Sequence, residues 1–245
     1  MVVYLLTAHR ALQMLSPNYK LISRFLFFKG VNKLYITVGL VFCGTFSFAQ
    51  FSAGVKYGNS ISFIISTDSF TPREVNDGLL VGQAGGIVMQ YLTQPHFGLQ
   101  WEINYVQKGW IENFGNESDI FTTRLTYIDV PLLGHAYIGK KVVRYFVNAG
   151  PYLGYLISSK EEREGSFDDE DITFRYVESR DNKLDFGIRG GLGIEILTQV
   201  GMFQIEGGYN FGVASILDKH ITPIPTSVQN QSVVVTLGYL FMFNP

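Results

Sequence analysis

Cysteine, charge and long apolar runs are all scarce in this chain. Its single cysteine, Cys43, excludes a disulfide framework and a zinc site built from several cysteines. Charged residues make up 16% of the sequence, whereas soluble domains average roughly 25%. After Gln50 no uninterrupted apolar run approaches the ~20 residues that a transmembrane helix needs. These absences argue against a disulfide-stapled module and against a membrane protein built from helices.

The first 49 residues are typical of an export signal. They contain five basic residues and no acidic one, and an apolar run follows over residues 34–46. Ser47 and Ala49 then place small residues where signal peptidase requires them. We therefore predict a cleaved signal peptide over residues 1–49, with cleavage after Ala49.

Two features of this leader bear on the mature chain. Bulky Phe42 precedes Cys43 and disfavours lipid attachment there. Because 49 residues is long for a signal peptide, a translation start near Val31 is a second hypothesis, under which residues 1–30 are an artefact. Removing the leader's five basic residues from the total of 19 leaves 14 against 21 acidic ones, a net charge of about −7. That balance is not typical of a nucleic-acid-binding protein, so we expect no nucleic acid partner.

Alternation of polar and apolar residues recurs along the whole chain after Gln50, without a convincing helical stripe. Aromatic residues at 15% and 26 glycines are also typical of β-structure. Short and long connections between the alternating segments follow one another strictly. This predicts an up-and-down barrel with tight turns and both chain ends at one end and loops at the other. The eight expected strands are 51–65, 80–92, 97–110, 122–138, 142–158, 183–198, 201–214 and 231–243, with tight connections at 93–96, 139–141 and 198–201 and longer ones at 66–79, 111–121, 159–182 and 215–230.

The segment DFGIRGGLGIEI, residues 185–196, shows why the two faces of each strand matter. One face carries Asp185, Arg189 and Glu195 among glycines, and the other is almost wholly apolar. A soluble barrel of the lipocalin type has the same period, with its apolar face inside. Here the polar faces are rich in glycine and poor in lysine, which suits a narrow lumen. The apolar faces carry aromatic residues near the strand ends, as in the interfacial girdles of outer-membrane barrels.

The last strand supports the membrane alternative. Thr236, Gly238, Phe241 and Phe243 form a pattern that resembles the recognition signal of outer-membrane barrel assembly, although an ordinary amphipathic edge strand has a similar pattern. We therefore predict an all-β, eight-stranded antiparallel transmembrane barrel over residues 50–245, in the bacterial outer membrane. Its termini should be periplasmic and its long loops extracellular. Several strands exceed the ~9–11 residues needed to cross, so the barrel should project beyond the outer interface.

Four segments carry a resemblance to a known family. YIDVPLL (127–133), AGPYLGYLI (149–157), DFGIRGGLGIEI (185–196) and FQIEGGYNFGV (203–213) occur in an order and spacing that resemble the PorT-like outer-membrane β-barrel family of Bacteroidetes. The resemblance covers essentially residues 50–245. It implies an eight-stranded outer-membrane barrel. The family's namesake takes part in type IX protein secretion, but nothing in this sequence singles the chain out for that role.

The polar faces place a near-neutral set of charges inside the predicted barrel. Eight strands leave an interior that side chains can fill, and buried charges are tolerated when paired. A salt-bridged plug is therefore the leading interpretation and a narrow ion path the alternative. Asp129 is a further candidate, but Pro131 is expected to introduce a bulge that blurs the phase of that strand. The predicted lumen charges are Lys56, Glu102, Lys108, Arg124, Arg144, Asp185, Arg189, Glu195 and Glu206.

Two other kinds of chemistry have candidate residues in the sequence. A rim enzyme would need a base and a partner, and His220 with Asp218 and Ser215 is the one candidate set near the loop end, since His96 lies in a tight turn and His135 in a strand. The acidic loop 158–183 invites a calcium site, but it lacks the ordered ligand spacing of an EF-hand. We therefore expect no catalytic residue, no metal site and no cofactor.

The leading functional expectation is a non-enzymatic outer-membrane protein. It would bind partners through its extracellular loops or support an envelope or type IX secretion complex. Its other expected partners are the lipid bilayer and, during biogenesis, the barrel-assembly machinery. A narrow pore is the alternative, and a rim enzyme is the third hypothesis.

Overall fold

The computed structural model describes residues 50–67, 72–74, 78–94, 96–114, 119–140, 142–166, 168, 172, 174–218 and 227–243. Within these ranges no helix is long and apolar enough to span a membrane. The described strands are β1 (Gln50–Thr67), β2 (Pro72–Glu74), β3 (Leu80–Gln94), β4 (Phe97–Asn113), β5 (Ile120–Lys140), β6 (Val143–Glu164), β7 (Leu184–Thr198), β8 (Gly201–Gly212) and β9 (Ser227–Met242).

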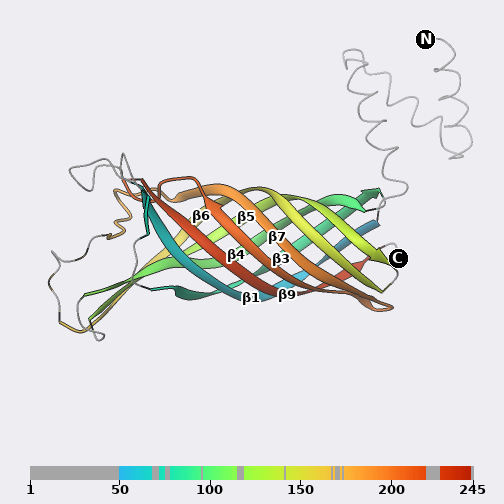
Figure 1. Cartoon of the computed structure of the whole chain (residues 1–245), viewed down its shortest axis with the longest axis horizontal. Helices are drawn as coiled ribbons and strands as arrows, with labels where there is room; N and C mark the ends of the chain where they lie inside the picture. The colour runs from blue at the N-terminus through green and yellow to red at the C-terminus, as the bar shows by residue number, and fades with distance from the viewer. Residues whose placement is uncertain are drawn as a thin grey trace, which may run out of the picture. The chain divides into compact units, whose positions relative to one another are not determined.

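Eight of these strands form a closed antiparallel ring (Figure 1). Each strand from β3 onward pairs with the next in the chain, and β9 pairs back onto β1 from Ser52 opposite Met242 to Thr67 opposite Ser227. The prediction of an eight-stranded up-and-down barrel is confirmed. The short β2 was not expected, and it adds a small hairpin to the far end of β1.

The two ends of the barrel differ in their connections. The turns β3–β4, β5–β6 and β7–β8 are at most two residues long, and they lie at the end where β1 begins and β9 finishes. Figure 1 shows the C-terminus at this end, which we call the turn end. The longer connections lie at the opposite end, the loop end. This is the alternation that the sequence predicts.

Strands at the loop end run further than expected. Strand β6 was predicted to end at residue 158, but it reaches Glu164 and pairs there with Ile120 of β5. The polar run SSKEERE has no apolar alternation to mark it as a strand, and backbone pairing with β5 is what holds it extended. A bulge at Ile157 separates this extension from the barrel wall, because Thr126 pairs with Ser158 while Tyr127 pairs with Leu156.

The outer wall is apolar. Val55, Ile188, Leu192 and Leu237 are each at least 60% exposed, and they belong to a band of exposed aliphatic and aromatic side chains around the ring. Monomeric soluble proteins do not expose an apolar surface this extensive to water. Closure of the ring pairs the backbone groups of every strand, which is the condition for spanning lipid with strands. The wall is therefore built to face a bilayer.

Aromatic side chains mark the turn-end border of this band. Phe51 contacts both Trp101 and Phe243, with ring centroids 6.4 and 5.4 Å away, and Phe203 contacts Tyr239 at 5.2 Å. Such rings sit at the boundary between hydrocarbon and headgroups in membrane barrels. They form one girdle of the kind that the strand-end aromatics predict.

Glycines on the inner face leave space for other side chains in the interior. Substitution of Gly193 on β7 tests this. A Cβ at Gly193 would collide with the Ile205 carbonyl oxygen and with the Phe146 ring, whereas a Cβ at Gly190 on the same strand would meet nothing within 4 Å. We predict that Gly193→Ala lowers the free energy of unfolding by ~1–3 kcal/mol through overpacking. Gly190→Ala is the matched control and should leave it nearly unchanged. Urea unfolding of the folded barrel in vesicles measures both, and equal losses would contradict this packing.

Candidate functional site: the filled interior and its cap

Four charged side chains meet in the middle of the barrel, and we call them the central layer. Lys56 lies between two carboxylates, with its Nζ 2.6 Å from Glu102 Oε2 and 3.4 Å from Glu206 Oε2. Arg189 approaches the same pair from the other side, 3.2 Å from Glu206 Oε1 and 3.8 Å from Glu102 Oε2. Strands β1, β4, β7 and β8 contribute one residue each. Each carboxylate therefore bridges two cations across the bore.

An upper layer lies nearer the loop end and is centred on Lys108 of β4. Its Nζ is 2.8 Å from Asp129 Oδ2 and 2.9 Å from Asp185 Oδ2. Tyr152 of β6 donates its hydroxyl to Asp185 Oδ1 at 3.3 Å, and its ring centroid is 4.7 Å from the ammonium. The Tyr127 ring is 5.0 Å away on another side. Two carboxylates and two aromatic rings thus surround this buried lysine.

A lower layer lies nearer the turn end and gathers around Glu195 of β7. Gln90 and Gln204 donate to Glu195 Oε1 at 3.0 and 3.3 Å. His135 Nε2 lies 3.6 Å from the same oxygen, and its Nδ1 is 2.8 Å from Asn148 Oδ1. This layer relies on amides and an imidazole where the other two use lysine or arginine.

Together the three layers hold more acid than base. Lys56, Lys108 and Arg189 are the buried cations, and Glu102, Asp129, Asp185, Glu195 and Glu206 are the buried carboxylates, all at most 4% exposed. Amide donors compensate part of the difference, since Gln100 and Asn104 both donate to Glu102, at 2.6 and 2.7 Å. Buried carboxylates persist only with such partners. The result is a bore filled by mutually bonded side chains.

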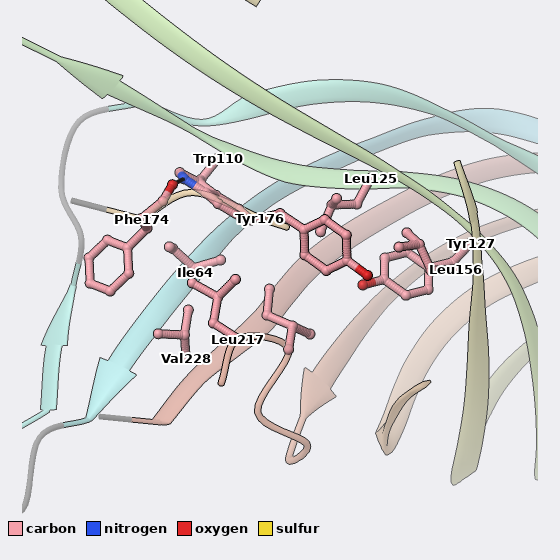
Figure 2. Close-up of a cluster of buried hydrophobic side chains, with 10 residues drawn as sticks. Ile64, Trp110, Leu125, Tyr127, Leu156, Phe174, Tyr176, Leu217 and Val228 are labelled. Atoms are coloured by element: carbon pink, nitrogen blue, oxygen red, sulfur yellow. Dashed lines mark hydrogen bonds between the residues drawn. The ribbon is translucent and has the colours of Figure 1, made fainter. Parts of the chain in front are cut away.

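A hydrophobic cap covers this network at the loop end (Figure 2). Strand residues from the barrel mouth meet Phe174 and Tyr176 from the β6–β7 connection and Ile216 and Leu217 from the β8–β9 connection. Every member is at most 6% exposed. The cap consists of Ile64, Trp110, Leu125, Tyr127, Leu156, Phe174, Tyr176, Ile216, Leu217 and Val228.

Hydrogen bonds fasten the cap to the barrel mouth. Phe174 donates its backbone N–H to Glu112 Oε1 at 3.1 Å and accepts from Trp110 Nε1 at 3.3 Å. Asp181 ties the two connections together, because it accepts from the backbone N–H groups of Val177 at 2.6 Å and Asp218 at 2.9 Å. Each connection is thus held by bonds as well as by apolar packing.

The cap also holds Tyr176 in its neutral form. Burial, together with the carboxylates of Asp181 and Glu178, raises the pKa of the Tyr176 phenol to about 12. Its hydroxyl donates to the Asn182 carbonyl at 3.4 Å. Tyr176 therefore adds no phenolate charge to the cap near neutral pH.

The structure places seven of the nine predicted lumen charges in the buried layers. These are Lys56, Glu102, Lys108, Asp185, Arg189, Glu195 and Glu206. Arg144 has the inward phase at the turn end, where it is half-buried and its guanidinium lies 4.5 Å from the Tyr137 ring centroid. Arg124 is the exception.

The prediction for Arg124 is wrong. Strand β5 keeps one phase from Phe121 to His135, and its register with β4 is the same on both sides of Pro131, so the bulge expected there does not occur. Arg124 therefore points outward, half-buried, and its Nη1 donates to the Val81 carbonyl at 3.1 Å. The same unbroken phase brings Asp129 inside. An uninterrupted alternation through the proline was the signal that could have identified this.

Other interior residues were missed because they are neutral. The charge pattern of the sequence does not indicate Gln90, Asn148 and Gln204, and for His135 it predicts only an interfacial or lumen role. The amides share the inward phase of their strands with the predicted charges, and that phase was the available signal.

The predicted assembly residues divide between the two faces of β9. Thr236 is buried and Gly238 faces Lys56 across the β1–β9 pair, while Phe241 and Phe243 are exposed on the outer wall. Phe241 and Phe243 contact each other edge to face at 5.2 Å.

The residues weighed for catalysis and calcium do not form a site within the described ranges. Ser215 donates its hydroxyl to the Leu217 carbonyl and accepts from the Val228 N–H, so it acts as a bridge inside the connection. His220 lies outside the described residues, as does most of the acidic DDED run. Among the residues that the structure describes, no group of three or more His, Cys, Asp or Glu side chains is arranged to hold a metal ion.

Comparison with known proteins gives one family. A model of the outer membrane protein beta-barrel domain matches residues 48–218. No curated protein matches the chain.

Several solved structures are similar to this chain at low identity. OprG from Pseudomonas aeruginosa is 10% identical with a TM-score of 0.45, covering 79% of this chain and 96% of its own. Neisserial surface protein A is 12% identical with a TM-score of 0.43, covering 80% and 99%. Ail, the attachment invasion locus protein of Yersinia pestis, is 13% identical with a TM-score of 0.38, covering 78% and 99%.

Lys108 offers a direct test of the buried layers. We predict that Lys108→Met lowers the free energy of unfolding by ~3–5 kcal/mol, because it leaves two facing carboxylates without their cation. Adding Asp129→Asn and Asp185→Asn to this variant should recover most of the loss. Lys183→Met, which removes an exposed partner of Glu178, is the control and should change stability little. If Lys108→Met were no worse than the control in vesicle unfolding, the upper layer would not be a stabilising element.

Proposed function

Because this chain belongs to the outer membrane protein beta-barrel domain family, we propose that it is a closed, non-enzymatic barrel that acts through its loop end. In this proposal the loop end binds a partner or supports an envelope complex. The barrel itself anchors that surface in the outer membrane and does not transport a solute.

The filled and capped bore is the observation that carries this proposal. Three layers of bonded side chains occupy the interior, and the cap covers them at the loop end. A solute would have to break ion pairs such as Lys56–Glu102 at 2.6 Å and then displace the cap. Both are costly, since a buried charge that loses its partner destabilises by ~3–5 kcal/mol. Closure of this kind favours a role at the surface over one in permeation.

The extension at the loop end is the surface that we expect to bind a partner protein. Strands β4, β5 and β6 continue past the cap, and residues 157–166 are exposed. Among the described residues, β6 beyond Leu156 pairs only with β5, so its other edge presents backbone groups. Exposed edges bind extended partner segments. Charged residues at 160–164 protect such an edge from unspecific association.

The proposal also includes an orientation of the barrel in the outer membrane. We infer that residues 1–49 are a cleaved signal peptide, that the turn end with both termini of the mature chain faces the periplasm, and that the loop end is extracellular. The pattern of Thr236, Gly238, Phe241 and Phe243 would then be recognised by the barrel-assembly machinery. The resemblance to the PorT-like family makes a type IX secretion component one candidate for the partner.

Conductance tests closure against the alternative of a narrow pore. We expect the purified full chain to produce no current steps in planar bilayers, because the bore is filled and capped. Heat-dependent gel mobility on the same preparation verifies that the barrel is folded. Reproducible openings from folded protein would contradict the proposal and favour the pore.

Photo-crosslinking in whole cells tests the binding surface. A photoreactive residue at Glu162, on the β6 extension, should give a protein adduct of defined mass, and the same residue at Leu192 on the lipid-facing wall is the matched control. Mass spectrometry of the adduct identifies whether a secretion component is bound. The absence of a protein adduct at Glu162, or the same adduct at both positions, would argue against the extension as the binding surface.

A further inference from the structure

We propose that a polar groove on the outer wall binds the phosphorylated headgroup of a glycolipid in the outer leaflet of the membrane. The groove lies on the β1–β6 side, at the base of the loop-end extension. This inference rests on the orientation given above, in which the loop end is extracellular. It adds a lipid-binding site to a wall that would otherwise only be solvated by lipid.

A row of polar side chains crosses the apolar wall there. Asn59 of β1 pairs in register with Gln83 of β3, whose backbone N–H donates to the Gln107 side chain of β4 at 3.0 Å. Gln107 pairs with Thr126 of β5, and Thr126 pairs with Ser158 of β6. Five neighbouring strands thus place polar side chains at one level on the outer face. Isolated polar residues on a wall need no explanation, but a continuous row does.

An aromatic row lies directly beneath the polar row. Tyr57 pairs with Gly85, Gly85 with Tyr105, Tyr105 with Ile128, and Ile128 with Tyr155. All three tyrosines are at least 40% exposed. Tyrosines at such a position mark the border between acyl chains and headgroups. The polar row therefore sits at headgroup level.

The polar row is hollowed into a groove of about 560 Å³. The Arg124 side chain, from β5, reaches the Val81 carbonyl of β3 within this groove. The space is large enough for a sugar phosphate group, and it opens on the lipid side. Its lining includes Gln83, Gln107, Arg124, Ser158, Lys160 and Glu162.

Two cations give the groove its charge preference. Arg124 and Lys160 are direct partners in the β5–β6 register, and both line the groove. Among the described residues neither forms an ion pair. Glu162 is the single acidic residue of the lining, so the balance favours an anion. Guanidinium and ammonium groups together are well suited to phosphate oxygens.

Hydrogen-bonding capacity in the groove matches a sugar. Within the described structure the Gln83 side-chain amide and the Ser158 hydroxyl form no hydrogen bond. Both lie on the polar row, beside the cations. A headgroup with hydroxyls and a phosphate would use the amide, the hydroxyl and the two cations together. Its acyl chains would then run down the wall past the tyrosine row, a path that a soluble phosphate compound would leave empty.

Binding of purified lipid A tests the site. The folded full chain in detergent is titrated with bisphosphorylated lipid A and followed by native mass spectrometry, with fully dephosphorylated lipid A as the second probe. We expect retention of the bisphosphorylated form, and a roughly tenfold or greater loss of affinity in Arg124→Gln/Lys160→Gln, because two charged hydrogen-bond donors are removed. Inorganic phosphate should not compete at comparable concentrations.

The matched control is Arg175→Gln/Lys183→Gln. It removes the same charge at the loop end, from residues whose described ion pairs are with Glu161 and Glu178, and it should keep wild-type affinity. Equal losses in both double variants would show unspecific attraction and overturn the proposal, as would equal retention of the dephosphorylated lipid. Inorganic phosphate competing as well as lipid A would identify a soluble ligand and overturn it too. Gel mobility confirms that each variant is folded. The measurement involves neither conductance nor a protein partner, so its failure is distinguishable from failure of the proposed function.

Discussion

Closure of β9 onto β1 is the constraint on which the rest of this molecule depends. Lipid offers no partner for a backbone N–H or C=O, so strands span a membrane only when the ring leaves no open edge. The β1–β9 pair runs from Ser52–Met242 to Thr67–Ser227, nearly the full length of both strands. With the ring closed, the outer wall can be largely apolar. Among the described residues, β6 outruns β7 at the loop end and retains there an edge that another chain could use.

A ring of eight strands also decides what the interior can contain. The bore is narrow enough for side chains from opposite walls to meet, which is why Glu102 and Glu206 reach both Lys56 and Arg189. Glycines supply the space, as Gly193 does for the Phe146 ring. A network of this kind fills the bore. Under the proposed function, the parts outside the bore, the extension and the outer wall, are the ones that bind.

The groove and the charged layers share one origin. A strand alternates its side chains between lumen and lipid, so a change of phase by one residue transfers a charge from one side to the other. On β5 this places Asp129 beside Lys108 and leaves Arg124 outside with Lys160. A lysine thus belongs to the plug at Lys108 and is a potential ligand for an anion at Lys160, according to the face of the strand on which it lies.

The sequence by itself determined the barrel, its eight strands, the alternation of short and long connections and the inward face of most strands, because period-two patterning is local and is visible within each segment. It did not determine the phase of β5 across Pro131, the length of β6 or the existence of β2. Only the tertiary structure decided which charges meet, that Phe174 and Tyr176 join Ile216 and Leu217 over the mouth, and that five polar residues align in one row. Those features depend on the register between strands and on the closure of the ring, which are set by pairing among segments far apart in the chain.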